Sequence, residues 1–303
     1  MNMEQIQTEI RKLQEEYNAN PTPENLKKMQ SGMMELQSQM MTASLQGATA
    51  ALADTYGPGS EYASAAIAGA KAGAAAYSQA FGDLFGDGED DAEELSAFLD
   101  QHPVAEDKKK YLPIGALLLC VNDEPYMALA MRGDKGDWAE TLKESWGIEN
   151  AQDGKEMLEA LLKGRHESTF GEDYRKLKDG QPHDLDDDSV EAYQDVLEAL
   201  EEELPELLPF AKDCRRLLAW DLERAGFLAR IFTHLGWLAE AEAWDWISKT
   251  AIRVKAEFSC WEAYLASVLT GRAMAIGFNY GIVGAICELT EDDFLKSHPI
   301  SAF

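Results

Sequence analysis

Acidic and basic side chains stand beside tryptophans between residues 220 and 272, and they are the groups in this chain best suited to chemistry. Asp221 and Arg224 are one helical turn apart, so their side chains can form an ion pair on the surface of a helix. One hypothesis is a polar pocket that would serve an enzyme or an effector. The predicted pocket consists of Trp220, Asp221, Arg224, Arg230, Trp244, Trp261, Glu262 and Arg272.

The same residues also fit a structural role. Paired charges beside large aromatic side chains commonly fix how helices dock, and such ion pairs are easily mistaken for active sites. Ser259 and Glu262 have the spacing of a capping box, so Glu262 can simply stabilise the start of a helix. A concave, partly solvated site would support the pocket, whereas a dry and fully paired core at Asp221 and Glu262 would remove it.

Motifs of familiar enzyme classes are absent from the sequence. We find no H-E-x-x-H, no phosphate-binding G-x-x-x-x-G-K-[ST], no G-x-G-x-x-G and no G-x-S-x-G. The histidines lack the spacing of metal ligands, so we expect no metal and no cofactor. A Cys–His dyad stays open, because such partners meet only in space. The five histidines are His102, His166, His183, His234 and His298.

Three helices are predicted to position the candidate pocket. Apolar residues recur at steps of three and four from Leu218 to Phe232, from Trp244 to Phe258 and from Trp261 onward. Gly236 can adopt the left-handed conformation that ends the first helix, and Ser259 can cap the third. The short connections indicate antiparallel packing in an all-helical domain.

Six short motifs between residues 146 and 272 are specific for one family when they occur together. They are W-D-x-x-R at 220–224, E-A-W at 242–244, F-S-x-W-E at 258–262, G-R at 271–272, W-G-I at 146–148 and L-L-K-G-R-H at 161–166. On these motifs the second half of the chain resembles the bacterial domain-of-unknown-function 1266 family. The resemblance implies a compact helical domain and an accessory or immunity-type protein near secreted toxins. It implies no catalytic residues. Arg165 departs from the Gly-His pair of that family.

Composition restricts the classes of partner. The formal net charge of −28 argues against nucleic acid, which is bound through clusters of Lys and Arg. It also disfavours anionic membrane surfaces. It favours steered association with a basic protein. Four cysteines without a C-x-x-C pair lie in apolar stretches, which indicates buried, reduced thiols. Because the N-terminus shows no signal peptide, we expect a cytoplasmic protein.

One segment concentrates the negative charge. From residue 184 to residue 206 there is no Lys or Arg. The segment is either a solvated acidic face or a surface that meets a basic partner or mimics a nucleic-acid backbone. The candidate partner surface consists of Asp184, Asp186, Asp187, Asp188, Glu191, Glu201, Glu202 and Glu203.

Three regions follow from composition and breaks in the pattern. Residues 1–86 are predicted to form a helical hairpin and an Ala/Gly-rich helix, residues 87–109 an acidic linker, and residues 110–303 the helical domain. The two hairpin helices carry apolar seams that can pair with each other or with a second chain, so a homo-oligomer through this hairpin stays open.

Local signals define further elements of a mainly α fold. Asn150 can cap a helix that runs through Leu162, and a helix should begin at Asp188 or Ser189. Thr290 can cap a final turn. Residues 111–131 fit either a strand hairpin or helix, and the family resemblance favours helix for the first arm.

The functional expectation is a cytoplasmic, acidic protein-binding module, in particular an immunity or accessory protein of a bacterial toxin or secretion system. The alternative is an enzyme or toxin effector that uses the Asp/Glu/Arg pocket.

Overall fold

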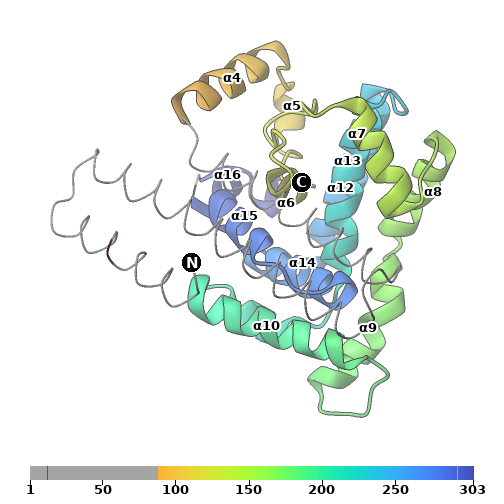
Figure 1. Ribbon diagram of the computed structural model, residues 1–303, viewed down its shortest axis with the longest axis vertical. Helices are drawn as coiled ribbons and strands as arrows, with labels where there is room; N and C mark the ends of the chain where they lie inside the picture. The colour runs from red at the N-terminus through yellow and green to blue at the C-terminus, as the bar shows by residue number, and fades with distance from the viewer. Residues whose placement is uncertain (1–11, 13–87, 292) are drawn as a thin grey trace, which may run out of the picture. The chain divides into compact units, whose positions relative to one another are not determined.

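Helices make up all the regular structure in the described part of the chain. The computed structural model describes residue 12, residues 88–291 and residues 293–303, and it has no strand there (Figure 1). This confirms the mainly α prediction. The predicted hairpin and Ala/Gly-rich helix lie outside the described residues. The elements are α4 (Gly88–Gln101), α5 (Glu106–Lys109), α6 (Ala116–Val121), α7 (Lys135–Thr141), the π-helix η1 (Leu142–Trp146), α8 (Ala151–Leu162), α9 (Arg165–Lys178), α10 (Asp187–Glu203), α11 (Leu208–Asp213), α12 (Leu218–His234), α13 (Glu240–Glu257), α14 (Trp261–Ile276), α15 (Tyr280–Glu291), α16 (Phe294–Ser297) and the 3₁₀ turn η2 (Ile300–Ala302).

Helix α12 forms the centre of the unit that spans residues 95–303. It packs against α6, α8, α9, α13 and α14, and Figure 1 shows it running through the middle of these helices. Every residue from Leu218 to Phe232 is buried, including four charged ones. A helix buried on all sides must be apolar nearly all round, so those four charges need partners on other elements.

Two glycines let α12 approach an irregular segment closely. Gly115 has φ +84°, a left-handed conformation that glycine adopts without strain. A Cβ atom at Gly226 would lie 2.7 Å from the backbone of Ile114, and one at Gly115 would lie 2.4 Å from the nitrogen of Phe227. Both positions therefore require glycine for this contact between α12 and the segment before α6.

The periodicity correctly predicted α12, α13 and α14. Gly236 has φ +76° after the end of α12, as expected. Asn150 caps α8 by accepting hydrogen bonds from the backbone nitrogens of Gln152 and Asp153. His234 is the last residue of α12, and its Nε2 atom lies 2.8 Å from the carbonyl oxygen of Gly133.

Several local predictions were wrong. Cys260, not Ser259, is the N-cap of α14, and no side chain caps that helix, so the expected capping box with Glu262 does not form. Thr290 lies inside α15 and donates to the carbonyl of Ile286 instead of starting a new turn. Asp186 caps α10, which begins at Asp187, slightly earlier than expected.

Other segments also differ from expectation. Helix α9 was not predicted, although Phe170, Tyr174 and Leu177 have helical spacing. Residues 111–131 contain α6 followed by turns, so the first arm is helical and the hairpin does not form. The four cysteines are half-buried, not buried. Within the described residues no helix has the length and apolar character needed to cross a membrane.

Candidate functional site

Four buried charges on α12 are the most unusual side chains of the fold. Asp221 and Arg230 are 0% exposed, Glu223 is 1% exposed and Arg224 is 8% exposed. A buried charge is costly unless hydrogen bonds and an opposite charge compensate it. The four residues form two clusters, because Asp221 and Arg224 contact α9 whereas Glu223 and Arg230 contact the segment around α6.

The first cluster joins the starts of α9 and α12. The backbone nitrogen of His166 lies 3.0 and 2.9 Å from the two carboxylate oxygens of Asp221, and that of Glu167 lies 3.1 Å from Oδ2. Glu167 in turn accepts a 2.7 Å hydrogen bond from the backbone nitrogen of Leu217. Each helix therefore supplies a carboxylate for the free N–H groups at the start of the other.

Arg224 completes this cluster. Its Nη2 atom lies 2.6 Å from Oδ1 of Asp221 and 2.7 Å from Nδ1 of His166. The guanidinium also lies 4.9 Å from the ring centre of Trp220 and 5.8 Å from that of Trp146, within the range of cation–π contacts.

The protonation of the first cluster follows from burial. Burial and the neighbouring Arg224 and Arg165 lower the pKa of His166 to about 4. The ring is therefore neutral at neutral pH, and Nδ1 accepts from Arg224. Burial raises the pKa of Asp221, and the hydrogen bonds from α9 and from Arg224 oppose that rise.

The second cluster holds the irregular backbone around α6. Glu223 accepts hydrogen bonds from the backbone nitrogens of Gly115 (3.2 Å) and Leu118 (3.1 Å) and from the Tyr264 hydroxyl (2.8 Å). Burial raises the pKa of Glu223, and these hydrogen bonds oppose part of that rise.

Arg230 binds carbonyl groups of the same segment. It donates to the carbonyl oxygens of Leu112 (2.6 Å), Ile114 (3.4 Å), Tyr126 (3.2 Å) and Ala128 (3.1 Å). Burial lowers its pKa to about 10, so the side chain stays charged at neutral pH. Arg230 therefore replaces the hydrogen bonds that a regular helix or sheet would supply to these carbonyls.

The structure does not gather the eight residues of the predicted polar pocket. Trp220, Asp221 and Arg224 lie together at α9, whereas Arg230 lies at residues 112–128. The other four residues have separate neighbours. The Trp244 indole nitrogen lies 3.4 Å from Glu240, and the Trp261 indole donates to the carbonyl of His298. Arg272 donates to the carbonyl of Gly277, and Glu262 is exposed.

Sequence reasoning missed three participants: His166, Glu167 and Glu223. One signal could have found Glu223. Charges at positions 221, 223 and 224 point in several directions from one otherwise apolar helix, so at least one of them had to be buried. Tyr264 fits the sequence as an aromatic wall of the pocket, but its bond to Glu223 could not be predicted, because the two residues are 41 positions apart.

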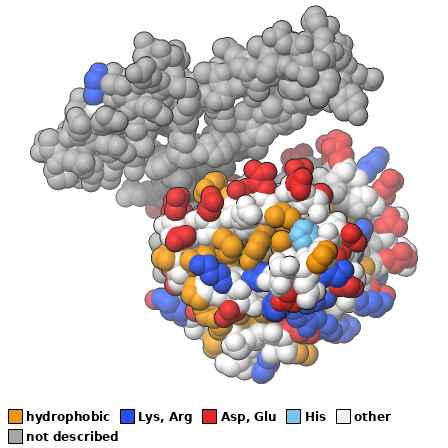
Figure 2. Space-filling model, turned by 90° about the horizontal axis from the view of Figure 1, so that it is seen from below, with side chains coloured by type: hydrophobic (Ala, Val, Ile, Leu, Met, Phe, Trp, Pro, Cys, Tyr) orange, Lys and Arg blue, Asp and Glu red, His pale blue; other side chains and the backbone are white. Residues whose placement is uncertain are grey.

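The candidate partner surface lies at the two ends of α10, with Asp184 and Asp186 just before the helix and Glu201, Glu202 and Glu203 in its last turn. Ala192, Val196 and Leu200 are buried, and α10 packs against α14 through that face. All eight acidic residues of the candidate partner surface are exposed. None of the eight forms an ion pair with a Lys or Arg of the described residues. The face drawn in Figure 2 carries both carboxylates and Lys or Arg side chains.

Metal ligands do not cluster in the part of the chain that the structure describes. No group of three or more His, Cys, Asp or Glu side chains there could hold a metal ion.

The comparisons with known proteins give one match. Residues 141–280, which run from the end of α7 into α15, match the model of a family described as Protein of unknown function (DUF1266). This part of the chain is similar to that family. The match confirms the resemblance drawn from W-D-x-x-R and the accompanying motifs. The matched residues include all four buried charges of α12 and the acids of the candidate partner surface. No curated protein and no solved structure matches the chain.

Proposed function

We propose that this protein is an acidic protein-binding module whose α10 face contacts a basic partner. The observation that supports the proposal is the exposed acids at both ends of α10, in a stretch with no Lys or Arg between residues 184 and 206. Such a surface attracts a positively charged protein over long distances and speeds its association.

The position of the acids on the helix adds a second argument. Glu201, Glu202 and Glu203 occupy the last turn of α10. Negative charge at a helix C-terminus opposes the helix dipole, so these residues do not help the helix to form. A role in binding gives a reason for their presence that helix stability does not.

The resemblance to the family suggests the kind of partner. We propose a basic toxin or a basic component of a secretion system, which this module would neutralise or accompany in the bacterial cytoplasm. Many toxins that attack nucleic acids are themselves basic, so an acidic face could cover the surface with which they bind phosphates.

The alternative function, an enzyme or effector, has less support. Asp221 is buried and bonded to α9 and Arg224, whereas Glu262 is exposed on another helix. Each buried charge of α12 is engaged with backbone groups, so its geometry suits helix docking. We therefore propose binding in preference to catalysis.

The test is co-purification of the tagged, full-length protein from its own cells at moderate salt. The test variant combines Glu201→Gln, Glu202→Gln and Glu203→Gln. The control combines Glu140→Gln, Glu144→Gln and Glu149→Gln, which removes the same charge from other exposed positions. We expect one basic protein with the unchanged chain and the control, and at least about tenfold less with the test variant. Equal recovery with both variants would contradict the proposal.

A further inference from the structure

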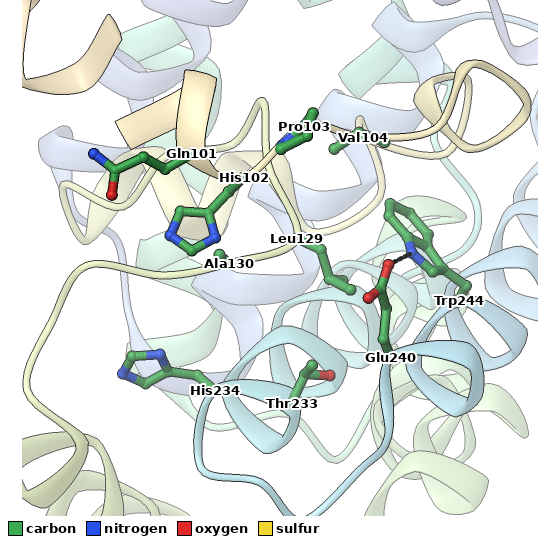
Figure 3. Close-up of a pocket in the computed structure, with 10 residues that line it drawn as sticks. All are labelled: Gln101, His102, Pro103, Val104, Leu129, Ala130, Thr233, His234, Glu240 and Trp244. Atoms are coloured by element: carbon green, nitrogen blue, oxygen red, sulfur yellow. Dashed lines mark hydrogen bonds between the residues drawn. The ribbon is translucent and has the colours of Figure 1, made fainter. Parts of the chain in front are cut away.

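A cavity lies near the C-terminal end of α12, outside the two clusters of buried charges. Its volume is about 340 Å³, which is within the range of small-molecule sites. Side chains from three separate parts of the chain line it. They include His102, Leu129, Thr233, His234, Glu240 and Trp244. Figure 3 shows Glu240, Trp244 and Leu129 on one side, the His102 ring opposite them, and Thr233 and His234 along α12.

The polar groups of the cavity are mainly acceptors. The Glu240 carboxylate is exposed, and no Lys or Arg of the described residues forms an ion pair with it. Thr233 donates its hydroxyl proton to the carbonyl of Ala229, which leaves the oxygen lone pairs available. His234 can only donate from Nε2 to the carbonyl of Gly133, so Nδ1 is an acceptor when the ring is neutral.

Aromatic and apolar groups complete the lining. Trp244 is 6% exposed, and its indole nitrogen points toward Glu240 at 3.4 Å. Leu129 is 8% exposed. Of the described residues that line this cavity none is a Lys or Arg. The Glu240 carboxylate favours a positive charge, and Trp244 and Leu129 offer apolar surface beside it.

We propose that this cavity binds an organic cation, namely an ammonium or guanidinium group on a short apolar stem. Glu240 pairs with the cationic group, and Trp244 and Leu129 contact the stem. A neighbouring cavity of about 540 Å³ shares Glu240 and Trp244, so a longer stem can continue along α13. Lys108 also lines that second cavity, but its ammonium lies 3.3 Å from Asp107.

Two kinds of ligand carry an ammonium or guanidinium group on an apolar stem. One is a free amine of the cell, and the other is the Lys or Arg side chain of a protein partner. This site is distinct from the α10 surface, so it can be present whether or not the α10 face binds a basic protein.

The test is isothermal titration calorimetry of the full chain with three probes. Pentan-1-amine represents a free amine, N-acetyl-lysine amide represents a protein side chain, and pentan-1-ol is the neutral counterpart of the first. We expect at least one of the two cations to bind with a 1:1 stoichiometry at concentrations below about 10 mM, and pentan-1-ol to give no signal. Binding of the amine alone would indicate a free ligand, and binding of the lysine derivative alone would indicate a partner's side chain.

Two variants make the test specific. Glu240→Gln keeps the size of the side chain and removes its charge, so we expect the affinity for the cation to fall at least about tenfold. Glu140→Gln removes the same charge from an exposed position outside the cavity and should leave the affinity unchanged. Three results would overturn the proposal: no binding of either cation, equal affinity in Glu240→Gln, or equal affinity for pentan-1-ol.

Discussion

Single residues of α12 stabilise parts of the backbone that no regular structure satisfies. Asp221 accepts from the start of α9, Glu223 accepts from the start of α6, and Arg230 donates to four carbonyls between residues 112 and 128. Buried backbone N–H and C=O groups without partners destabilise a protein. A charged side chain that bonds several of them therefore offsets part of the free-energy cost of its own burial. These contacts connect the centre of the fold to its least regular segments.

His166 leads to a prediction about pH. The folded protein keeps this ring neutral down to about pH 4, whereas an unfolded chain protonates a histidine near pH 6.5. As pH falls, the unfolded state binds the proton first. The free energy of unfolding should therefore decrease between pH 6.5 and pH 4, by at most about 3 kcal/mol from this residue.

The measurement is urea unfolding of the unchanged protein and of His166→Gln across that pH interval. Glutamine can still accept from Arg224 but does not titrate, so the decrease caused by residue 166 should disappear. Asp221 and Glu223 are present in both proteins, so their protonation cancels in the difference. Parallel stability curves for the two proteins would show that His166 does not titrate as its environment indicates.

Contacts between residues that are close in sequence could be predicted, and contacts between residues far apart in sequence could not. The cap of α8 was predicted because Asn150 bonds Gln152 and Asp153. The partner of Asp221 lies 55 residues earlier in the chain, and the partners of Arg230 lie 102 to 118 residues earlier. Side-chain spacing carries no information about such distant partners, so the eight-residue pocket was assembled from residues that the fold separates.

At the scale of elements, helical periodicity predicted α12, α13 and α14, because their apolar residues repeat at steps of three and four. The ends of the helices were harder to predict where no side chain caps them. Cys260 starts α14 without a side-chain hydrogen bond, so the Ser259 and Glu262 pattern was misleading. Most of α9 is polar, and its three spaced apolar residues were too few to stand out.

The close contact between α12 and the segment before α6 leads to a second prediction. Gly226→Ala places a methyl group 2.7 Å from the backbone of Ile114, which has no flexible end that could move aside. We expect a loss of about 1–3 kcal/mol in the free energy of unfolding, because overpacking exceeds the gain in helix propensity.

Gly284→Ala is the matched control for this substitution. Gly284 lies in α15, is exposed and has no atom within 4 Å of an added Cβ. Alanine there should stabilise the protein by about 0.5–1 kcal/mol. Thermal or urea unfolding measures both variants. Stabilisation by Gly226→Ala as well would mean that α12 and residue 114 do not approach each other this closely.

At the scale of the whole molecule, the net charge of −28 is the basis for proposing a basic partner, and the fold decides where that charge is exposed. The packed side of α10 faces α14, so its acids are left on the outer surface. The composition predicted a basic partner but could not show which acids are exposed. The stretch without Lys or Arg between residues 184 and 206 indicated the acids, and the structure leaves all eight of them exposed.

The most direct test of the acidic face is the affinity for the recovered basic partner as a function of salt. Screening by ions weakens attraction between exposed charges. We expect the affinity of the unchanged chain and of the Glu140, Glu144 and Glu149 control to fall at least about tenfold between about 50 mM and 500 mM salt. The Glu201, Glu202 and Glu203 variant should bind more weakly at low salt and show a clearly shallower dependence. An affinity that stays constant across this range, or a variant that matches its control, would contradict binding through the α10 face.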